Sequence, residues 1–415
     1  MKYALMLALL FAIPRGVKAM DTLTVSIKQA DSTFLKNNLL LLAGQLNISA
    51  NQALQIQARV WPGPTITFDL NAFDPDNQRY FHTGPTGQKA AQFEQLLLTA
   101  GKRKFQILLA ATNTEISRQE LIDLLRELRY QLYLNYFEVF QQMQMIKVFD
   151  KQLIMLDELV TTYTNQAKEG NITMKEVIRL KAAYFSLNND KALAQNKLIE
   201  SQQKIRTILM TDAFVLPVSS EPWLSNINSL PTVNTLLDSA LSQRPDLKLA
   251  SLNRQYNQFD LKLQQRQRFP DVNLIGSYDQ RGGAFTNQLN VGISFTLPAW
   301  NLNKGNIQHA FNRVNIADNT LKATQQETRS EVIAAWESMN TSLNQYNKIT
   351  RFYSSDFDEL IEGMNENFKK RNISMLEFVD FFEAYISAES EYERVRAQLA
   401  FSAANINYVT SSSIY

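Results

Sequence analysis

The 415-residue sequence predicts a mainly α-helical fold, built as two repeats that each carry a pair of strands. Three observations support this prediction: a passage that occurs twice, long stretches with a coiled-coil period, and segments in which apolar and polar residues alternate. Glu169–Ser186 reads EGNITMKEVIRLKAAYFS, and Lys370–Ser387 reads KRNISMLEFVDFFEAYIS. Asn, Ile, Met, Glu, Ala, Tyr and Ser return in step, which indicates an internal duplication.

The long helices are predicted from the spacing of apolar residues. Between Leu121 and Tyr163 these residues recur about every 3.5 positions, the period of a coiled-coil seam. A turn must follow, because Gly170 and Asn171 both tolerate a left-handed backbone. The predicted helical hairpins comprise helices at about 102–168 and 174–210 around a tip at 169–173, and helices at about 304–368 and 376–407 around a tip at 370–374. Shorter helical segments are expected at about 31–59 and 232–268.

The strands are predicted from alternation. In NQLNVGISFTL, the residues Leu289, Val291 and Ile293 share one face, and polar or small residues occupy the other. The predicted organisation is a first repeat at 20–218 with strands at about 64–73 and 88–99, a linker at 219–231, and a second repeat at 232–415 with strands at about 271–280 and 287–297. Such alternation suits either a half-buried soluble sheet or a lipid-facing barrel.

The number of strands bears on that choice. Four strands cannot close on themselves, and an open sheet in lipid would leave its edges unsatisfied. Three copies of the chain would supply twelve strands, which is enough for a closed barrel with an aqueous lumen.

The first residues predict export. The stretch MKYALMLALLFAIPRGVKA has a basic start, an apolar run and small residues near its end, so residues 1–19 are expected to be a signal peptide. The alternative, a membrane anchor, is disfavoured because the apolar run is too short for roughly 30 Å of hydrocarbon. No later stretch offers roughly 18 uninterrupted apolar residues, so a membrane crossing would have to use strands.

Composition excludes several kinds of function. The formal net charge is +2, with 42 basic and 40 acidic side chains, so no charge excess attracts nucleic acid. Cysteine is absent and only two histidines occur, which disfavours disulfides and zinc sites, and we expect no bound metal or cofactor. No nucleophile elbow, phosphate-binding glycine loop or HExxH motif occurs, so an enzyme is not expected.

Three further stretches carry a resemblance to a known family: RPDLKLA at Arg244–Ala250, GISFTLPAWNLNKGNIQHA at Gly292–Ala310 and LLLTAGKRKF at Leu96–Phe105. With the two-repeat plan, they resemble the TolC-like outer-membrane efflux proteins. The last two stretches are similar to the junctions between strand and helix in the cobalt-zinc-cadmium resistance outer-membrane component branch.

The resemblance implies a homotrimer in the outer membrane of a Gram-negative bacterium, with a 12-stranded transmembrane β-barrel and a periplasmic α-helical tube. Its function would be that of the exit duct of a tripartite efflux pump, which passively conducts substrate from the periplasm to the exterior. Its partners would be a periplasmic adaptor protein, an inner-membrane transporter of the RND type for heavy metals or drugs, and outer-membrane lipid. The alternative is an exported coiled-coil scaffold or a periplasmic adaptor without a barrel, which two hairpins per chain disfavour.

The resemblance also assigns roles to the hairpin tips. Residues expected to dock the adaptor are Gly170, Asn171, Ile172, Thr173, Arg371, Asn372, Ile373 and Ser374. Glu377 and Asp380 would form an acidic ring around a constricted pore, although two exposed acids in the first turn of a helix are also ordinary. Phe378 would contribute to the constriction, although aromatic residues at helical spacing more often pack a hairpin.

Two smaller expectations concern single positions. Because Arg371 aligns with Gly170, we expect Asn372 to adopt the left-handed backbone at the second tip. Lys102, Arg103 and Lys104 follow a predicted strand. They could pair with lipid headgroups at the inner face of the barrel, or they could be an ordinary run of solvated charges. Residues expected in an aromatic belt at the membrane surface are Trp61, Trp300 and Tyr278.

Overall fold

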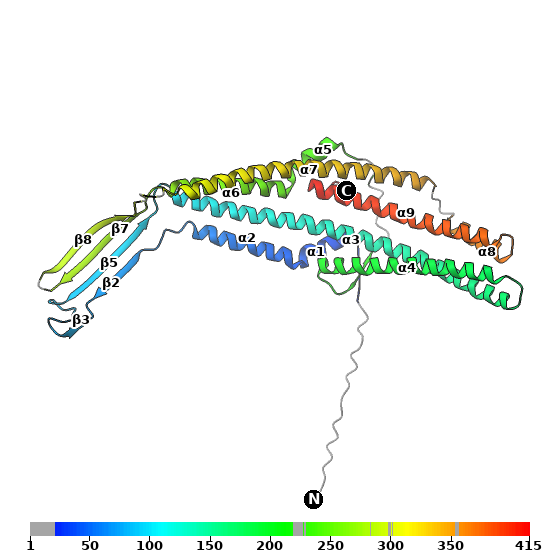
Figure 1. Cartoon of the computed structure of the whole chain (residues 1–415), viewed down its shortest axis with the longest axis horizontal. Helices are drawn as coiled ribbons and strands as arrows, with labels where there is room; N and C mark the ends of the chain where they lie inside the picture. The colour runs from blue at the N-terminus through cyan, green and yellow to red at the C-terminus, as the bar shows by residue number, and fades with distance from the viewer. Residues whose placement is uncertain are drawn as a thin grey trace, which may run out of the picture.

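The computed structural model describes residues 21–218, 227, 230–282, 284–297, 300, 302–352 and 357–415. The molecule is elongated, with a sheet at one end, long helices along its length, and helix tips at the other end (Figure 1). The expected signal peptide at 1–19 and nearly all of the expected linker at 219–231 lie outside the described residues. Among the helices of the described ranges, none combines the length and apolar character needed to cross a bilayer.

The first repeat contributes four helices. They are α1 (Ile27–Asn37), α2 (Leu39–Gln57), α3 (Lys102–Lys168) and α4 (Met174–Leu209). The single helix expected at 31–59 is therefore two helices, because Asn38 is extended and caps α2 by accepting hydrogen bonds from the N–H groups of Leu40 and Leu41. The Asn38 amide also donates to the carbonyl of Ile208, which fixes this break against the end of α4.

The second repeat contributes five helices among the described residues. They are α5 (Val233–Gln243), α6 (Pro245–Arg266), α7 (Lys304–Phe352), α8 (Phe357–Lys369) and α9 (Met375–Thr410). Pro245 occupies the first position of α6, where its missing N–H costs nothing, and α5 ends just before it. The helix expected at 304–368 is described as α7 and α8, and residues 353–356 between them lie outside the described part.

The main sheet combines the strands of both repeats. It contains β2 (Thr65–Leu70), β5 (Gln88–Leu97), β7 (Val272–Arg281) and β8 (Phe285–Phe295), in the order β2-β5-β7-β8. All neighbouring pairs are antiparallel. The repeats meet at β5 and β7, so β2 and β8 are edge strands that no other described strand of the chain covers.

Two small strand pairs were not expected from the sequence. β1 (Thr22–Val25) runs parallel to β6 (Phe214–Pro217) and joins the start of the described chain to the end of the first hairpin. β3 (Phe73–Asp74) and β4 (Arg79–Tyr80) form a short hairpin between β2 and β5, at the end of the strand expected at 64–73 and in the stretch after it.

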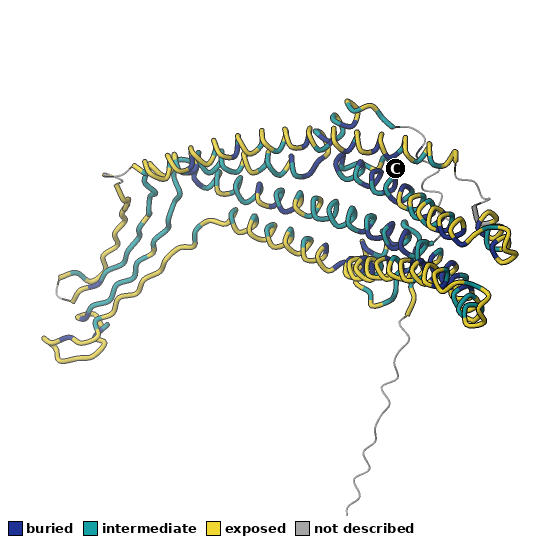
Figure 2. Tube along the Cα trace, turned by 45° about the vertical axis from the view of Figure 1, so that its right-hand side comes forward, coloured by how far each residue is buried: buried dark blue, intermediate teal, exposed yellow. Residues whose placement is uncertain are grey.

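Buried apolar residues form three clusters along the helical part, and the sheet has few (Figure 2). One cluster, with Leu132 and Tyr136, lies where α1 and α4 pack on α3. A second, with Val332 and Leu399, joins α5, α7 and α9. The third lies near the tips and joins the two hairpins through residues such as Leu156 and Phe378. A rod with such small separate cores leaves much of each helix exposed.

Candidate functional site: the hairpin tips and the sheet

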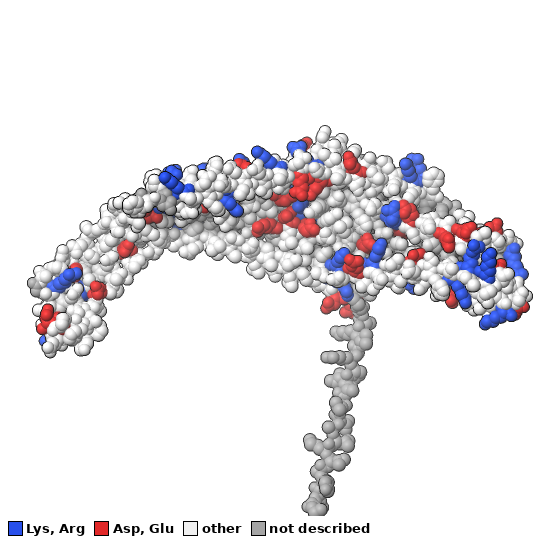
Figure 3. Space-filling view, in the orientation of Figure 1, with Lys and Arg blue, Asp and Glu red and all other residues white. Residues whose placement is uncertain are grey.

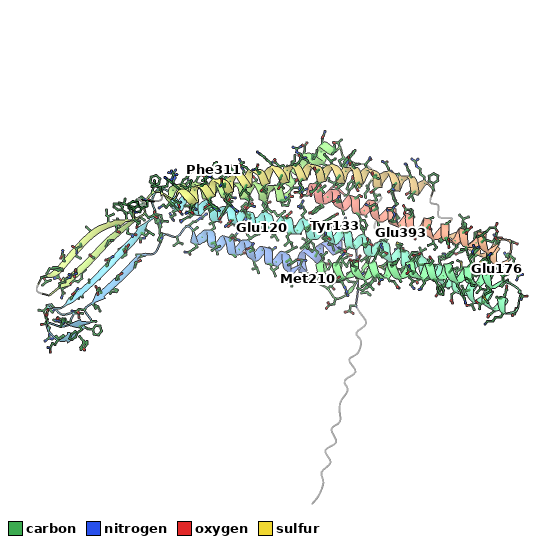
Figure 4. The ribbon with its side chains drawn as sticks, viewed as in Figure 1. Glu120, Tyr133, Glu176, Met210, Phe311 and Glu393 are labelled. Carbon is green, nitrogen blue, oxygen red and sulfur yellow. The ribbon has the colours of Figure 1, made fainter. Side chains whose placement is uncertain are left out.

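The first tip is a compact turn between α3 and α4. Gly170 has a φ of +78°, and its N–H donates to the carbonyl of Ala167, while the N–H of Asn171 donates to the carbonyl of Gln166 at 2.9 Å. This is the Schellman arrangement, which satisfies the last carbonyls of a helix. Thr173 then begins α4, and the Glu176 carboxylate accepts the Thr173 N–H at 2.9 Å. Figure 4 labels Glu176 at this far end of the helices.

The second tip repeats the same bonds with a different residue in the left-handed position. Arg371 has a φ of +59°, and the N–H of Asn372 donates to the carbonyl of Asn367 at 2.9 Å. The expectation that Asn372 adopts the left-handed backbone is therefore wrong. The position is fixed by the helix carbonyls that the turn must satisfy, and the Asn372 amide instead donates to the side-chain oxygen of Asn367 at 3.1 Å.

The two tips contact each other. The rings of Tyr163 and Phe368 are stacked with centroids 5.1 Å apart, and Arg371 Nη2 donates to Gln166 Oε1 at 3.2 Å. A groove of about 610 Å³ lies here between the hairpins. Its lining includes the acids Asp157 and Glu158 on α3, Lys369 at the end of α8 and Arg371 at the second tip. Charged side chains of both signs gather at this end of the molecule (Figure 3).

Glu377 and Asp380 are both exposed, three residues apart in the first turns of α9. Glu377 completes a reciprocal capping box, because its carboxylate accepts the Ser374 N–H at 2.7 Å and its own N–H donates to Ser374 Oγ at 3.3 Å. The hydrogen bond from the Ser374 backbone lowers the pKa of Glu377 below its usual value. The carboxylate is thus held ionised at the tip, and it has a structural role there.

Phe378 is fully buried within its own protomer. Its ring is stacked on Phe368 with centroids 4.3 Å apart, and Phe382 lies 6.2 Å away. These contacts favour the interpretation that the aromatic residues pack the second hairpin. A part for Phe378 in a pore constriction stays a prediction.

The main sheet has one mainly apolar face and one mainly polar face. The cross-strand partners Ile66, Phe93, Gly276 and Val291 share a face, and so do Phe68, Ala91, Tyr278 and Leu289. The opposite face carries Thr65, Thr67, Asp69, Gln92, Glu94, Asn273, Ser277, Asp279, Asn290 and Ser294. The apolar face is open to solvent in the single chain: Phe68 is 74% exposed and Val291 is 95% exposed.

A buried ion pair fixes the junction between the sheet and the helices. Lys102, at the start of α3, is only 7% exposed, and its ammonium lies 2.8 Å from the Asp271 carboxylate and donates to the carbonyl of Phe269 at 2.7 Å. Asp271 also accepts the N–H of Thr99 at 2.9 Å. Lys102 therefore does not meet lipid headgroups, because it joins the two repeats at the base of the sheet.

The RPD sequence before α6 has a structural explanation. Arg244 is 4% exposed and donates to both carboxylate oxygens of Asp246, to Glu331 on α7 and to the carbonyl of Val409 on α9. Burial would raise the pKa of Asp246, but the hydrogen bonds and charge of Arg244 outweigh it and lower that pKa. The motif therefore joins three helices of the second repeat.

His82 belongs to a polar cluster beyond the strands. Its Nδ1 donates to Asp74 Oδ2 at 2.7 Å, and its Nε2 lies 3.1 Å from the Thr86 hydroxyl. The hydrogen bonds from His82 and then Asn77 lower the pKa of Asp74 to about 2. Within the described ranges, no group of three histidine or acidic side chains is placed to hold a metal ion.

Comparison with solved structures identifies the class of fold. The chain superimposes on the Campylobacter jejuni CmeC outer membrane channel with a TM-score of 0.76 and 13% identity, covering 93% of this chain and 86% of that one. A membrane protein from Pseudomonas aeruginosa superimposes with a TM-score of 0.76 and 15% sequence identity, covering 95% of this chain and 92% of that one. CusC superimposes with a TM-score of 0.74 and 15% identity, covering 94% of each chain. At such identities the likeness establishes the fold, and the chain has the fold of these proteins.

The sequence comparisons are narrower. A family model described as outer membrane efflux protein matches residues 236–355, which run from α5 through the second strand pair into α7. A search of curated proteins finds no significant match. The matched part contains Arg244 with its carboxylate partners Asp246 and Glu331, and the apolar strand β8.

Proposed function

We propose that the protein is the outer-membrane channel of a tripartite efflux pump in a Gram-negative bacterium. The observation that carries the proposal is the main sheet, with one apolar face and two open edges, joined directly to long helical hairpins. An open edge in lipid leaves backbone groups unsatisfied, at a cost of several kcal/mol each. Pairing β2 of one copy with β8 of the next removes both edges.

A homotrimer satisfies this requirement. Three sheets supply twelve strands, enough for a closed barrel with a water-filled lumen. The apolar face would then meet lipid, and the face with Asp69, Glu94 and Asp279 would line the lumen. The helices of the three copies would continue the lumen into the periplasm as a tube. Substrate would pass through passively, and the energy would come from the inner-membrane transporter.

The partners follow from this assembly. The tips at 169–173 and 370–374 are the part of the protein farthest from the sheet (Figure 1), and a periplasmic adaptor would dock there. Support comes from the charged groove between the tips, which offers both signs of charge to a partner. The inner-membrane transporter would be of the RND type, exporting heavy metals or drugs. The likeness of the strand-to-helix junctions to the cobalt-zinc-cadmium branch is our reason for including metals.

The acidic ring is part of the same proposal. Three copies of Glu377 and of Asp380 around one aperture would produce a field that favours cations. Glu377 is suited to this role because its carboxylate is exposed and the hydrogen bond from the Ser374 backbone lowers its pKa, which favours the ionised form.

The absence of cysteine allows a direct test of the assembly. Thr67 on β2 and Asn290 on β8 both project from the polar face of opposite edge strands. We expect Thr67→Cys, combined in turn with Gln288→Cys, Asn290→Cys or Gly292→Cys, to give covalent trimers in outer-membrane fractions for at least one register. The Thr67→Cys single variant is the control and should give none.

Two further readouts complete the test. The purified protein should show heat-modifiable migration and ion conductance in planar bilayers. A monomer in the soluble periplasmic fraction, with no disulfide in any register, would refute the channel and favour the exported scaffold or adaptor.

A further inference from the structure

An arginine stacked on an exposed tryptophan marks one edge of the sheet base. The guanidinium of Arg103, in the first turn of α3, lies over the Trp61 ring at 4.3 Å from the ring centroid. Trp61 precedes β2 and is 53% exposed. The stack holds the planar guanidinium in one orientation and leaves the tryptophan edge open to the surroundings.

No described carboxylate of the chain neutralises the charge of Arg103. Its Nη2 donates to the carbonyl of Arg59, its Nε is buried without a hydrogen-bond partner, and no carboxylate of the described residues forms an ion pair with it. The neighbouring Lys102 differs in this respect, because Asp271 neutralises it at 2.8 Å. Arg103 is therefore a fixed cation that lacks an anion.

The surroundings of Arg103 increase the need for an anion. Helix α3 begins with Lys102, Arg103 and Lys104, and its first turn contains no acid, although the positive end of a helix dipole favours acids there. Arg59 and Lys104 are exposed, and neither is paired with a carboxylate of the described ranges. An external anion at this corner would meet the positive end of the helix dipole and the guanidinium of Arg103.

The depth of the corner suits a lipid headgroup. Gln95 Nε2 donates to the carbonyl of Pro62 at 2.8 Å, which places Trp61 level with the base of β5, just below the exposed apolar residues Ile66 and Phe68. Beyond the other edge strand, Trp300 is 98% exposed. Tryptophan is enriched where the hydrocarbon of a bilayer gives way to headgroups.

We propose that the corner formed by Trp61, Arg103 and the carbonyl of Arg59 binds the phosphate of an anionic phospholipid headgroup in the periplasmic leaflet of the outer membrane. The proposal rests on the membrane location given above. The guanidinium supplies its positive charge and the N–H donors that the Arg59 carbonyl leaves free, and the acyl chains extend along the apolar face toward Ile66. The sheet contributes the apolar contact and the start of α3 contributes the charge.

The experiment uses the full-length protein in detergent, with native mass spectrometry to count retained lipids and titration to measure affinity. The probes are dioleoyl-phosphatidylglycerol, dioleoyl-phosphatidylcholine and inorganic phosphate. We expect the wild-type protein to retain phosphatidylglycerol in preference to phosphatidylcholine, and Arg103→Gln to weaken phosphatidylglycerol binding about tenfold. Arg103→Lys, which keeps the charge and loses the planar donors, should weaken it by a smaller factor.

The matched control is Arg329→Gln, which removes an exposed arginine of α7 that has no carboxylate partner in the described chain and lies far from the sheet. It should leave the affinity for phosphatidylglycerol unchanged. Equal binding of phosphatidylglycerol by Arg103→Gln and wild type would overturn the proposal. Binding of inorganic phosphate with the affinity of phosphatidylglycerol would also overturn it, because it would indicate a site for a free anion. Conductance of Arg103→Gln in bilayers separates the two proposals: a conducting variant with normal lipid binding refutes only the lipid corner.

Discussion

Arg244 Nη1 donates to Glu331 Oε2 at 2.5 Å, and this bond joins the start of α6 to the middle of α7. The same guanidinium binds Asp246 and the carbonyl of Val409 near the end of α9. Arg244 thereby connects α6, α7 and α9, and Glu331 is next in sequence to Val332 of the core cluster that joins α5, α7 and α9. We therefore expect the second repeat to depend on Arg244.

Replacing Arg244 by Met should destabilise the protein by about 3 kcal/mol, because it leaves Glu331 without its ion-pair partner and Asp246 with only Arg126 at 3.8 Å. The measurement is denaturant unfolding followed by circular dichroism. The control is Arg254→Met, which breaks the more exposed pair with Asp318 and should cost at most about 1 kcal/mol. Equal effects of the two variants would contradict the importance assigned to burial.

The tip acids should have separable structural and electrostatic roles. Glu377→Gln keeps an acceptor for the Ser374 N–H but removes the charge, so stability should change by less than about 0.5 kcal/mol. With Asp380→Asn, the cation preference in planar bilayers should fall about threefold. Glu176→Gln makes the matching change at the first tip and should not alter selectivity. Unchanged selectivity in the double variant would remove the acidic ring.

Substitutions at the left-handed positions of the two tips, Gly170 and Arg371, should differ in their effect on stability. Gly170→Val introduces a β-branched side chain at a φ of +78° and should destabilise the first tip by about 1–2 kcal/mol. Arg371→Gly relieves the backbone but removes the bond to Gln166, so its net effect should be below about 1 kcal/mol. Hydrogen exchange of the Asn171 and Asn372 amides measures each tip separately. Faster exchange at Asn372 after Arg371→Gly would show that the bond to Gln166 dominates.

The polar cluster around Asp74 should lose its hydrogen bonds in acid. The folded pKa of Asp74 is lowered to about 2 from 3.8, so its contribution is fully present above pH 3.8 and is lost as the pH falls through 2. The backbone N–H groups of Asp76 and Asn77 donate to Asp74, and their protection against hydrogen exchange should fall in this pH range. Asp74→Asn should abolish the pH dependence of that protection. Protection that persists in wild type below pH 2 would contradict the assignment.

The parts of the fold that the sequence predicted are those with long periodic signals. The apolar spacing from Leu121 to Tyr163 indicates a helix of the kind seen in α3, and the alternation of Leu289, Val291 and Ile293 indicates β8. Both patterns extend over many residues, so single irregular positions do not obscure them. The duplicated passage indicated the paired tips for the same reason.

The missed features depend on partners far away in the sequence. β1 and β6 have four residues each, too few for a recognisable period, and they are defined only by their pairing. The burial of Lys102 requires Asp271 from the other repeat. At the second tip, residue preference favoured Asn372, but the helix carbonyls placed Arg371 in the left-handed region. Tertiary context decided each of these positions.

The parallel pair of β1 and β6 also has a consequence for the order of folding. Val215 exchanges hydrogen bonds with the Gln202 side chain at 2.7 and 3.0 Å, so β6 can settle on α4 as soon as the first hairpin has formed. β1 must wait for that surface, because its partner is synthesised nearly the whole repeat later. Closing so long a loop adds little cost, since each doubling of length costs only about 0.6 kcal/mol. β1 is therefore synthesised before the other described strands but is among the last strands of its repeat to pair.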